Sequence, residues 1–171
     1  WEWLHRLWGR LIGVVFIGPL LYFAARRRIP HTLKKPLALL LALGALQGFI
    51  GWYMVKSGLI HEPRVSHYRL ALHLSTALVI FSVLLVQVVR LSPRVQAACK
   101  TYHVVTTGRQ LRVHAWTALI LVALTIVWGA FVAGLDAGLI YNEFPTMGGH
   151  WIPSEFLFEK PWWKNFLDNH A

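Results

Sequence analysis

The sequence predicts an all-α membrane protein, a bundle of transmembrane helices. Of its 171 residues, 56% are hydrophobic and only 14% are charged, whereas about 25% are charged in ordinary soluble proteins. The hydrophobic residues form four runs long enough to cross a bilayer core, which is about 30 Å thick and needs roughly 20 helical residues. The net charge of +10 comes from basic residues placed between these runs. That placement is typical of membrane topology and argues against nucleic-acid binding.

The four apolar runs cover residues 1–25, 37–55, 68–89 and 113–135. Each is far longer than a β-strand usually is, so we expect each to form a helix. Two pairs of glycines, Gly9 with Gly13 and Gly44 with Gly48, have the spacing that lets helices approach closely in lipid. Glycine is also simply common in membrane helices, so this interpretation has an ordinary alternative.

The connections between the runs set the orientation of the chain in the membrane. The connections after the first and third runs carry basic residues and no acid, whereas every acid is expected on the opposite side. The positive-inside rule then places both basic connections in the cytoplasm or matrix. The basic residues are Arg26, Arg27, Arg28, Lys34, Lys35, Arg90, Arg94, Lys100, Arg109 and Arg112, and the acids are Glu2, Glu62, Asp136, Glu143, Glu155, Glu159 and Asp168.

The segment 136–171 has a different composition. Its many aromatic residues are interrupted by Pro145, Pro153 and Pro161, so it is too broken to span a membrane. We expect it on the outer membrane surface with aromatic rings at the level of the headgroups. Asp136 begins this segment and either caps the fourth helix or binds substrate; the structural role is favoured.

Two histidines occupy matching depths in this arrangement. His5 lies 21 residues before Arg26, and His73 lies 17 residues before Arg90. At 1.5 Å per residue these separations are about 31 Å and about 26 Å. Both helices run from outside to inside, so both imidazoles are expected just below the outer interface. Ionisable residues in that setting usually indicate function.

The two histidines also have matching neighbours. Each histidine has a small residue one turn deeper in the membrane, which leaves room for a flat macrocycle. Each also has a nearby arginine, which can bind an anionic haem propionate. The combination predicts a haem held between two imidazoles, although either histidine alone is as readily explained by snorkelling or hydrogen bonding at the interface. The small residues are Gly9 and Ala77, and the arginines are Arg6, Arg10 and Arg69.

Glu2 lies three residues before His5, on the same helical face. A Glu-x-x-His pair also occurs in di-iron bundles, but those need further carboxylates on facing helices. The runs offer none, so we reject that alternative. His114 begins the fourth run at the inner side, at the wrong depth to join the pair. The other histidines lie in loops or at helix edges, where we expect solvated roles: His31, His61, His67, His103, His150 and His170.

Four motifs, in order along the chain, resemble the haem A synthase family in the form shared by mitochondria and proteobacteria. The resemblance covers nearly the whole chain and implies an internal fragment, because family members have eight spans in two pseudo-symmetric halves. Four spans of the expected eight are then present. The motifs are Glu2-Trp-Leu-His5-Arg6 with Trp8-Gly9-Arg10, Gly51-Trp-Tyr-Met-Val-Lys-Ser-Gly58, Tyr68-Arg-Leu-Ala-Leu-His73, and Gly129-Ala-Phe-Val-Ala-Gly-Leu-Asp136-Ala-Gly138.

The resemblance also implies how the chain divides. Residues 1–90 are expected to be spans two to four of an N-terminal haem-binding half, and residues 91–112 an inner basic loop. Residues 113–135 are then the first span of the C-terminal half, and residues 136–171 a truncated aromatic-rich outer loop. Such a fragment is expected to be inactive alone.

The family oxidises a methyl group of haem O to the formyl group of haem A, with water as the expected oxygen source, for cytochrome c oxidase assembly. The resemblance makes His5 and His73 the axial ligands of the substrate haem and Glu2 the catalytic acid or base. It makes Arg6, Arg10 and Arg69 haem-binding residues and places a haem b in the missing half. The implied partners are haem O and haem A, the lipid bilayer, haem O synthase and oxidase assembly factors. The expected location is a bacterial inner membrane, with the mitochondrial inner membrane as the alternative.

Two other classes of protein use similar residues. One is a cytochrome b electron-transfer subunit, in which a bis-histidine haem makes no product. The other is an assembly protein that stores or transfers haem without chemistry. Glu2 favours the enzyme, because a pure electron carrier needs no carboxylate beside its ligand.

Overall fold

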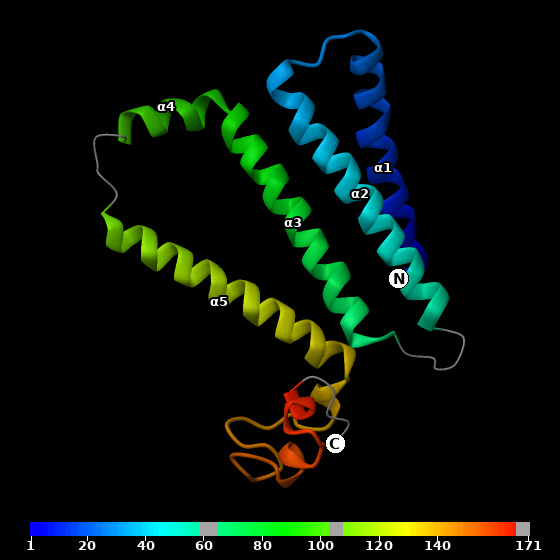
Figure 1. Cartoon of the computed structure of the whole chain (residues 1–171), viewed down its shortest axis with the longest axis vertical. Helices are drawn as coiled ribbons and strands as arrows, with labels where there is room; N and C mark the ends of the chain where they lie inside the picture. Colours follow the sequence, from blue (N-terminus) through cyan, green and yellow to red (C-terminus); the bar gives the residue numbers. More distant parts are fainter. Residues whose placement is uncertain (59–64, 103–107, 167–171) are drawn as a thin grey trace. The chain divides into compact units, whose positions relative to one another are not determined.

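The computed structural model describes residues 1–58, 65–102 and 108–166. Among these residues, α1, α2, α3 and α5 are long and apolar enough to cross a membrane. The all-α fold and the four spans predicted from the sequence are therefore confirmed. In chain order (Figure 1) the elements are α1 (Glu2–Ala25), α2 (His31–Gly58), α3 (His67–Leu91), α4 (Pro93–Tyr102), α5 (Arg109–Gly134) and the 3-10 helices η1 (Ala137–Leu139), η2 (Ser154–Leu157) and η3 (Trp162–Phe166).

The chain divides into two compact units, one of Trp1–Val55 with Ser75–Gly108 and the other of Lys56–Leu74 with Arg109–Ala171. The division falls inside α3. The first unit therefore contains α1, most of α2, the inner part of α3, and α4. The second contains the N-terminal end of α3, α5 and the residues that follow it, 136–166, which we call the outer segment. Each unit is described by itself.

Apolar side chains in the first unit point mostly outward. Leu40 and Ile50 are its only hydrophobic side chains below one-tenth exposure among the described residues, and α1 has no buried residue. In water this exposure would cost roughly 25 cal/mol for each Å² of apolar surface. Lipid removes that cost, because acyl chains solvate leucine and valine as well as a protein core does.

The inner end of α1 is closed by backbone hydrogen bonds. Arg27 adopts the left-handed conformation with φ of 53°, so that its N–H donates to Ala24 O at 2.9 Å and the N–H of Arg28 donates to Phe23 O at 2.9 Å. This pair of bonds is the Schellman motif that ends many helices. It ends α1 inside the first run of basic residues, where the sequence places the membrane boundary.

The inner connection contains a helix that hydropathy did not predict. Pro93 begins α4 directly after α3 ends at Leu91. Proline has no N–H to continue α3 but fits the first turn of a new helix, and the N–H of Val95 donates to Ser92 Oγ at 3.4 Å. A proline is also accommodated near the start of α2, where Pro36 lies inside the helix. That helix therefore begins six residues before the apolar run at 37.

The predicted glycine packing is not seen at either glycine pair. A Cβ built on Gly9, Gly13, Gly44 or Gly48 would meet no atom within 4 Å in the described structure. These glycines leave open surface on α1 and α2. A close backbone approach is seen instead at Gly134.

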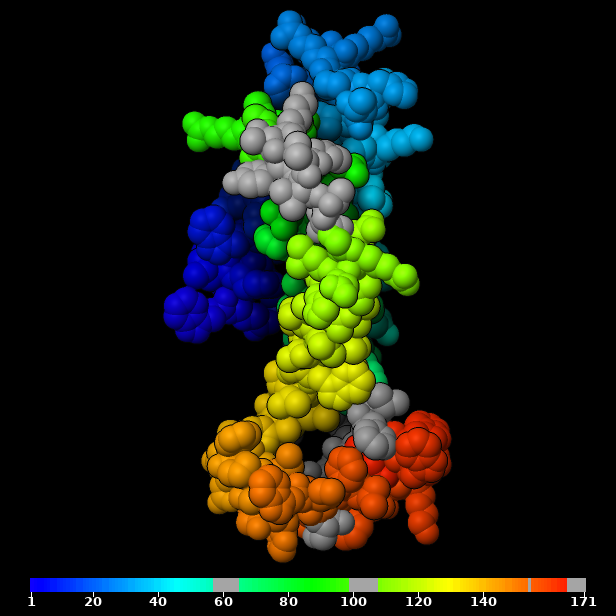
Figure 2. Space-filling model, turned by 90° about the vertical axis from the view of Figure 1, so that its left-hand side faces the viewer, coloured from blue at the N-terminus to red at the C-terminus, as the bar shows by residue number. Residues whose placement is uncertain are grey.

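The outer segment is held together by turns and side-chain hydrogen bonds (Figure 2, orange and red). Gly148 and Gly149 have φ of 59° and 79°, and Met147 and His150 exchange backbone hydrogen bonds of 2.7 and 3.2 Å around them. Two consecutive positive φ angles favour glycine at both positions of such a turn. Large hydrophobic residues remain exposed on this segment, as expected for a part that meets headgroups: Leu139, Phe144, Trp151, Ile152, Leu157, Phe158, Trp162 and Trp163.

Asn165 organises the last part of the outer segment. Its side chain is only 6% exposed. The Nδ2 group donates to Glu159 O and to Trp162 O, both at 2.8 Å, while Oδ1 accepts from the N–H of Glu159 at 2.8 Å. One amide thus satisfies three backbone groups and joins the chain before η3 to η3 itself.

Candidate functional site

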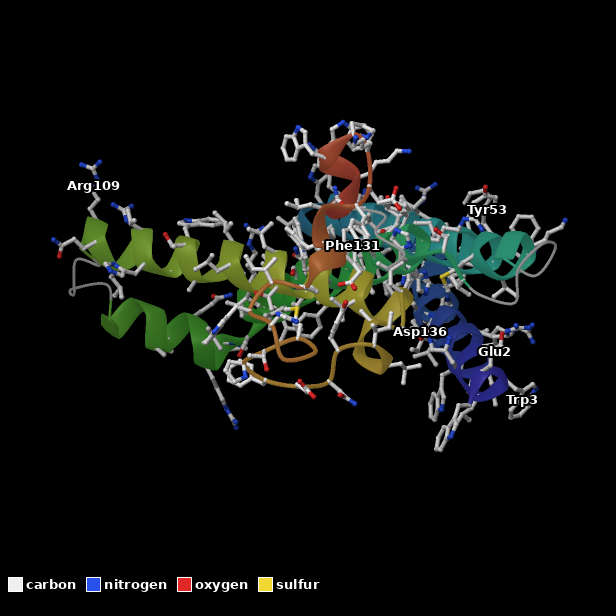
Figure 3. The ribbon with its side chains drawn as sticks, turned by 90° about the horizontal axis from the view of Figure 1, so that it is seen from below. Glu2, Trp3, Tyr53, Arg109, Phe131 and Asp136 are labelled. Atoms are coloured by element: carbon white, nitrogen blue, oxygen red, sulfur yellow. The ribbon has the colours of Figure 1, made fainter. Side chains whose placement is uncertain are left out.

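The outer end of α1 carries four of the predicted site residues. Glu2, His5, Arg6 and Arg10 all lie within its first three turns and are solvent-exposed. Glu2 stands at the first residue of the helix (Figure 3), where the positive end of the helix dipole favours a carboxylate. The structure brings Glu2 and Arg6 together as an ion pair between Oε1 and a guanidinium nitrogen.

The Glu2–Arg6 pair joins residues four apart on one helix. The side chains of Glu2 and Arg6 are 72% and 47% exposed, so in water such a pair contributes only about 0.3–0.5 kcal/mol. Its importance is geometric rather than energetic. The pair orients the Glu2 carboxylate along the face that also carries His5, and it supplies the compensating charge.

His5 projects from α1 one turn before Gly9. Its backbone N–H donates to Trp1 O at 3.0 Å, which closes the first turn of the helix. A Cβ built on Gly9 would have no atom within 4 Å. The surface of α1 one turn after His5 is therefore open in the described structure, and the predicted haem contact stays a prediction.

His73 lies two turns into α3, in the second unit. Its side chain is half-buried, and its Nδ1 atom is shielded from solvent. Arg69 one turn outward and Ala77 one turn inward are also half-buried. Since His5 and His73 belong to different units, their predicted face-to-face arrangement stays a prediction.

The sequence interpretation was wrong about the environment of His67. We expected it to be solvated at a helix edge; it is the first residue of α3, but it is only 7% exposed. Its ring packs against Tyr68, with centroids 4.0 Å apart, and edge-on against Phe131 at 5.7 Å. Burial follows from the end of α5, where Gly134 leaves room for the His67 backbone. The spacing of Ala130 and Gly134, two small residues four apart, is the sequence signal that could have indicated this contact.

Asp136 and the remaining described histidines occupy other positions along the chain. Asp136 is exposed and has φ of 54°; it ends α5 and precedes η1 without a side-chain hydrogen bond to the first turn of η1. His31 is the exposed first residue of α2, and His150 closes the glycine turn. His114 is exposed on α5, with Nδ1 2.7 Å from Gln110 O. His61, His103 and His170 lie outside the described residues.

The geometry defines a class of protein before any relative is considered. Within the described ranges, no three His, Cys, Asp or Glu side chains are grouped so as to hold a metal ion by themselves. The candidate residues instead stand singly or in pairs near the outer ends of long apolar helices. The chain is a multi-pass helical membrane protein with polar residues at the N-terminal ends of two spans.

Comparison with known proteins identifies the family. The chain belongs to the family described as Cytochrome oxidase assembly protein, whose pattern it matches over residues 1–171. It is similar to proteins named Heme A synthase from Rhodospirillum centenum (52% identity over 100% of this chain and 44% of the relative), Wolbachia pipientis (46%, 99% and 50%) and Rhodopseudomonas palustris (44%, 99% and 45%). The chain thus spans about half the length of these curated relatives. No solved structure matches it.

Proposed function

We propose that this chain is part of a haem A synthase, a membrane oxidoreductase that converts haem O to haem A for cytochrome c oxidase assembly. The observation that carries the proposal is the 44–52% identity, across essentially the whole chain, to relatives that are named Heme A synthase. The reaction oxidises a ring methyl to a formyl group with water as the oxygen source. Such an oxidation releases electrons and protons; a haem b, which we place in the C-terminal half of the full-length protein, would pass the electrons on to an external acceptor.

In this proposal residues 1–90 form most of the half that holds substrate haem, and His5 and His73 would be the ligands of its iron. Two structural features support these roles. Open space lies beside Gly9, one turn inward of His5, and the Nδ1 atom of His73 is shielded from water. A metal-binding histidine usually binds through one ring nitrogen while the other donates a hydrogen bond, so we propose Nε2 of His73 as the ligand atom.

Glu2 is the proposed acid or base. It shares a helical face with His5, and its carboxylate is held by Arg6. A carboxylate at that point accepts protons as the methyl group is oxidised and orients the attacking water. Arg6, Arg10 and Arg69 are the residues proposed to bind the haem propionates.

The proposed location is an inner membrane, bacterial or mitochondrial, with the haem-binding ends of α1 and α3 toward the outer side. Haem O synthase and cytochrome oxidase assembly factors are the proposed protein partners, because substrate and product are poorly soluble and both are delivered within the membrane. No role in nucleic-acid binding is proposed. Ten of the 17 lysines and arginines lie in the two connections that we place on the inner side, in agreement with the positive-inside rule.

The test compares Glu2→Gln with His73→Ala in a full-length protein that contains these residues. Bound haem is identified by mass spectrometry, and haem A formation is measured in a strain that lacks the enzyme. We expect Glu2→Gln to retain haem but to lose about 10²–10⁴-fold in rate, the usual contribution of a positioned acid or base. His73→Ala should lose axial ligation. Equal loss of haem in both variants would reduce Glu2 to a structural role.

The same measurement separates the enzyme from the alternatives. Haem O and haem A found together support catalysis, whereas haem b alone favours an electron-transfer cytochrome b. Haem O bound without conversion, even in the full-length wild type, would indicate a protein that only stores or transfers haem.

A further inference from the structure

The end of α5 touches the start of α3 at the level of the backbone. A Cβ built on Gly134 would lie 2.6 Å from His67 Cβ and 2.7 Å from His67 Cα. Ordinary carbon contacts are about 3.5–4.0 Å. Because one of the two contacted atoms belongs to the backbone, no change of side-chain rotamer can relieve the overlap. Only glycine fits at position 134 while the two helices stay where they are.

Aromatic rings fix the rotation of α3 at the same place. Phe131, one turn before Gly134 on α5, is edge-on to the rings of His67 and Tyr68, each with centroids 5.7 Å away. Trp128 supports Phe131 from its own helix at 6.2 Å, again close to perpendicular. Edge-to-face contacts depend on ring orientation, so they resist turning of α3 about its axis. The contact at Gly134 therefore sets the separation of α3 and α5, and Phe131 sets the rotation of α3 about its own axis (Figure 3 labels Phe131 on α5).

His73 follows His67 on the same uninterrupted helix, six residues or about 9 Å further along the axis. Both residues and α5 belong to the second unit. A helix transmits a displacement of its first turn to its second turn almost undiminished, because its rise and rotation per residue are fixed. The position of the His73 imidazole therefore depends on the contact at Gly134.

We infer that Gly134, with Phe131, is a positioning device that holds His67 at the start of α3 and thereby places His73 against the haem. The inference rests on the proposed function, in which His73 is an axial ligand. An alanine at position 134 must move the two backbones apart by about 1 Å to restore an ordinary contact. A displacement of about 1 Å in a supporting residue can lower a rate by about 10²-fold.

The experiment uses the full-length protein in membranes with the substitution Gly134→Ala and a matched control, Gly129→Ala. Both glycines lie on α5, but a Cβ on Gly129 would meet no atom within 4 Å. Alanine raises helix propensity in the interior of α5 at position 129 and less at position 134, its last residue. Neither gain weakens the helix, so a loss seen only in Gly134→Ala reports the contact with His67. The measurements are haem bound per protein, the low-spin electron paramagnetic resonance signal of that haem, and the thermal midpoint of haem-free protein.

We expect Gly134→Ala to shift the resonance signal and lower haem A formation about 10- to 100-fold, with a lower haem-free midpoint than the control. Gly129→Ala should match wild type in signal and rate. His67→Ala retains its Cβ and its backbone, so it should change the signal less than Gly134→Ala does. A signal and rate for Gly134→Ala equal to those of Gly129→Ala would overturn the inference.

A milder variant covers the case in which Gly134→Ala fails to accumulate. Phe131→Leu introduces no overlap and removes only the oriented ring. A shifted resonance signal in Phe131→Leu supports the positioning role, and an unchanged one overturns it. Wild-type protein that binds no haem would instead refute the proposed function, so the two failures are distinguishable.

Discussion

Replacing Asn165 with alanine should increase local unfolding at the end of the outer segment. The substitution removes three hydrogen bonds of 2.8 Å from a side chain that is 6% exposed. At about 1 kcal/mol net for each bond, the loss is about 3 kcal/mol. Since 1.4 kcal/mol corresponds to a factor of ten, the local opening equilibrium should rise about a hundredfold.

Hydrogen exchange of the Glu159 amide measures that opening directly, because its N–H donates to Asn165 Oδ1. The protein is held in lipid nanodiscs, and exchange is followed in peptides that cover the outer segment. Asn142→Ala is the control, since Asn142 lies in the same segment with an exposed side chain. If Glu159 exchanges no faster in Asn165→Ala than in Asn142→Ala, the three bonds do not hold this segment, and the reasoning is refuted.

Three further results are expected. Gly149→Val should cost about 1–2 kcal/mol locally, because Gly149 has φ of 79°; faster exchange of the His150 amide would reveal it, and unchanged exchange would contradict it. Burial, the charge of Glu155 and the hydrogen bond to Glu155 raise the pKa of Tyr141 above 10. The protonated phenol therefore stabilises the folded segment below pH 10, and this contribution is lost as the pH rises further; ultraviolet titration of Tyr141→Phe against wild type checks the assignment. Ser92→Ala should weaken the start of α4 by about 0.5–2 kcal/mol, seen as faster protease cleavage in the inner connection and absent if Ser92 is not a cap.

The spans were predictable because their signals are local. Length, apolar composition and the distribution of basic residues each act on a single helix or a single connection. The signals for the start of α4 were equally local, since Ser92 is a cap and Pro93 lies in the first turn. A search for long apolar runs nevertheless misses a helix of ten residues. The same holds for the polar first turn of α2.

The burial of His67 could not be predicted from its own neighbourhood. It depends on Gly134, which lies 67 residues later in the chain, and on which helix α5 packs against. The glycine pairs at which close helix packing was predicted, such as Gly44 with Gly48, have no close contact in the described structure. Spacing shows that a helix can pack closely, but only the fold decides where it does.

The lengths of the helices have a consequence for how the protein meets its membrane. With 24 residues α1 is about 36 Å long, and with 28 residues α2 is about 42 Å long, so both exceed a hydrocarbon core of about 30 Å. The excess of one to two turns allows the first turns of α1, with the Glu2–Arg6 pair, to stand among the headgroups. A bilayer of longer acyl chains would draw that pair into hydrocarbon, where charges are costly. Membrane thickness would then decide whether the Glu2–Arg6 pair meets headgroups or hydrocarbon, so lipid composition would act on the stability of the first turns of α1.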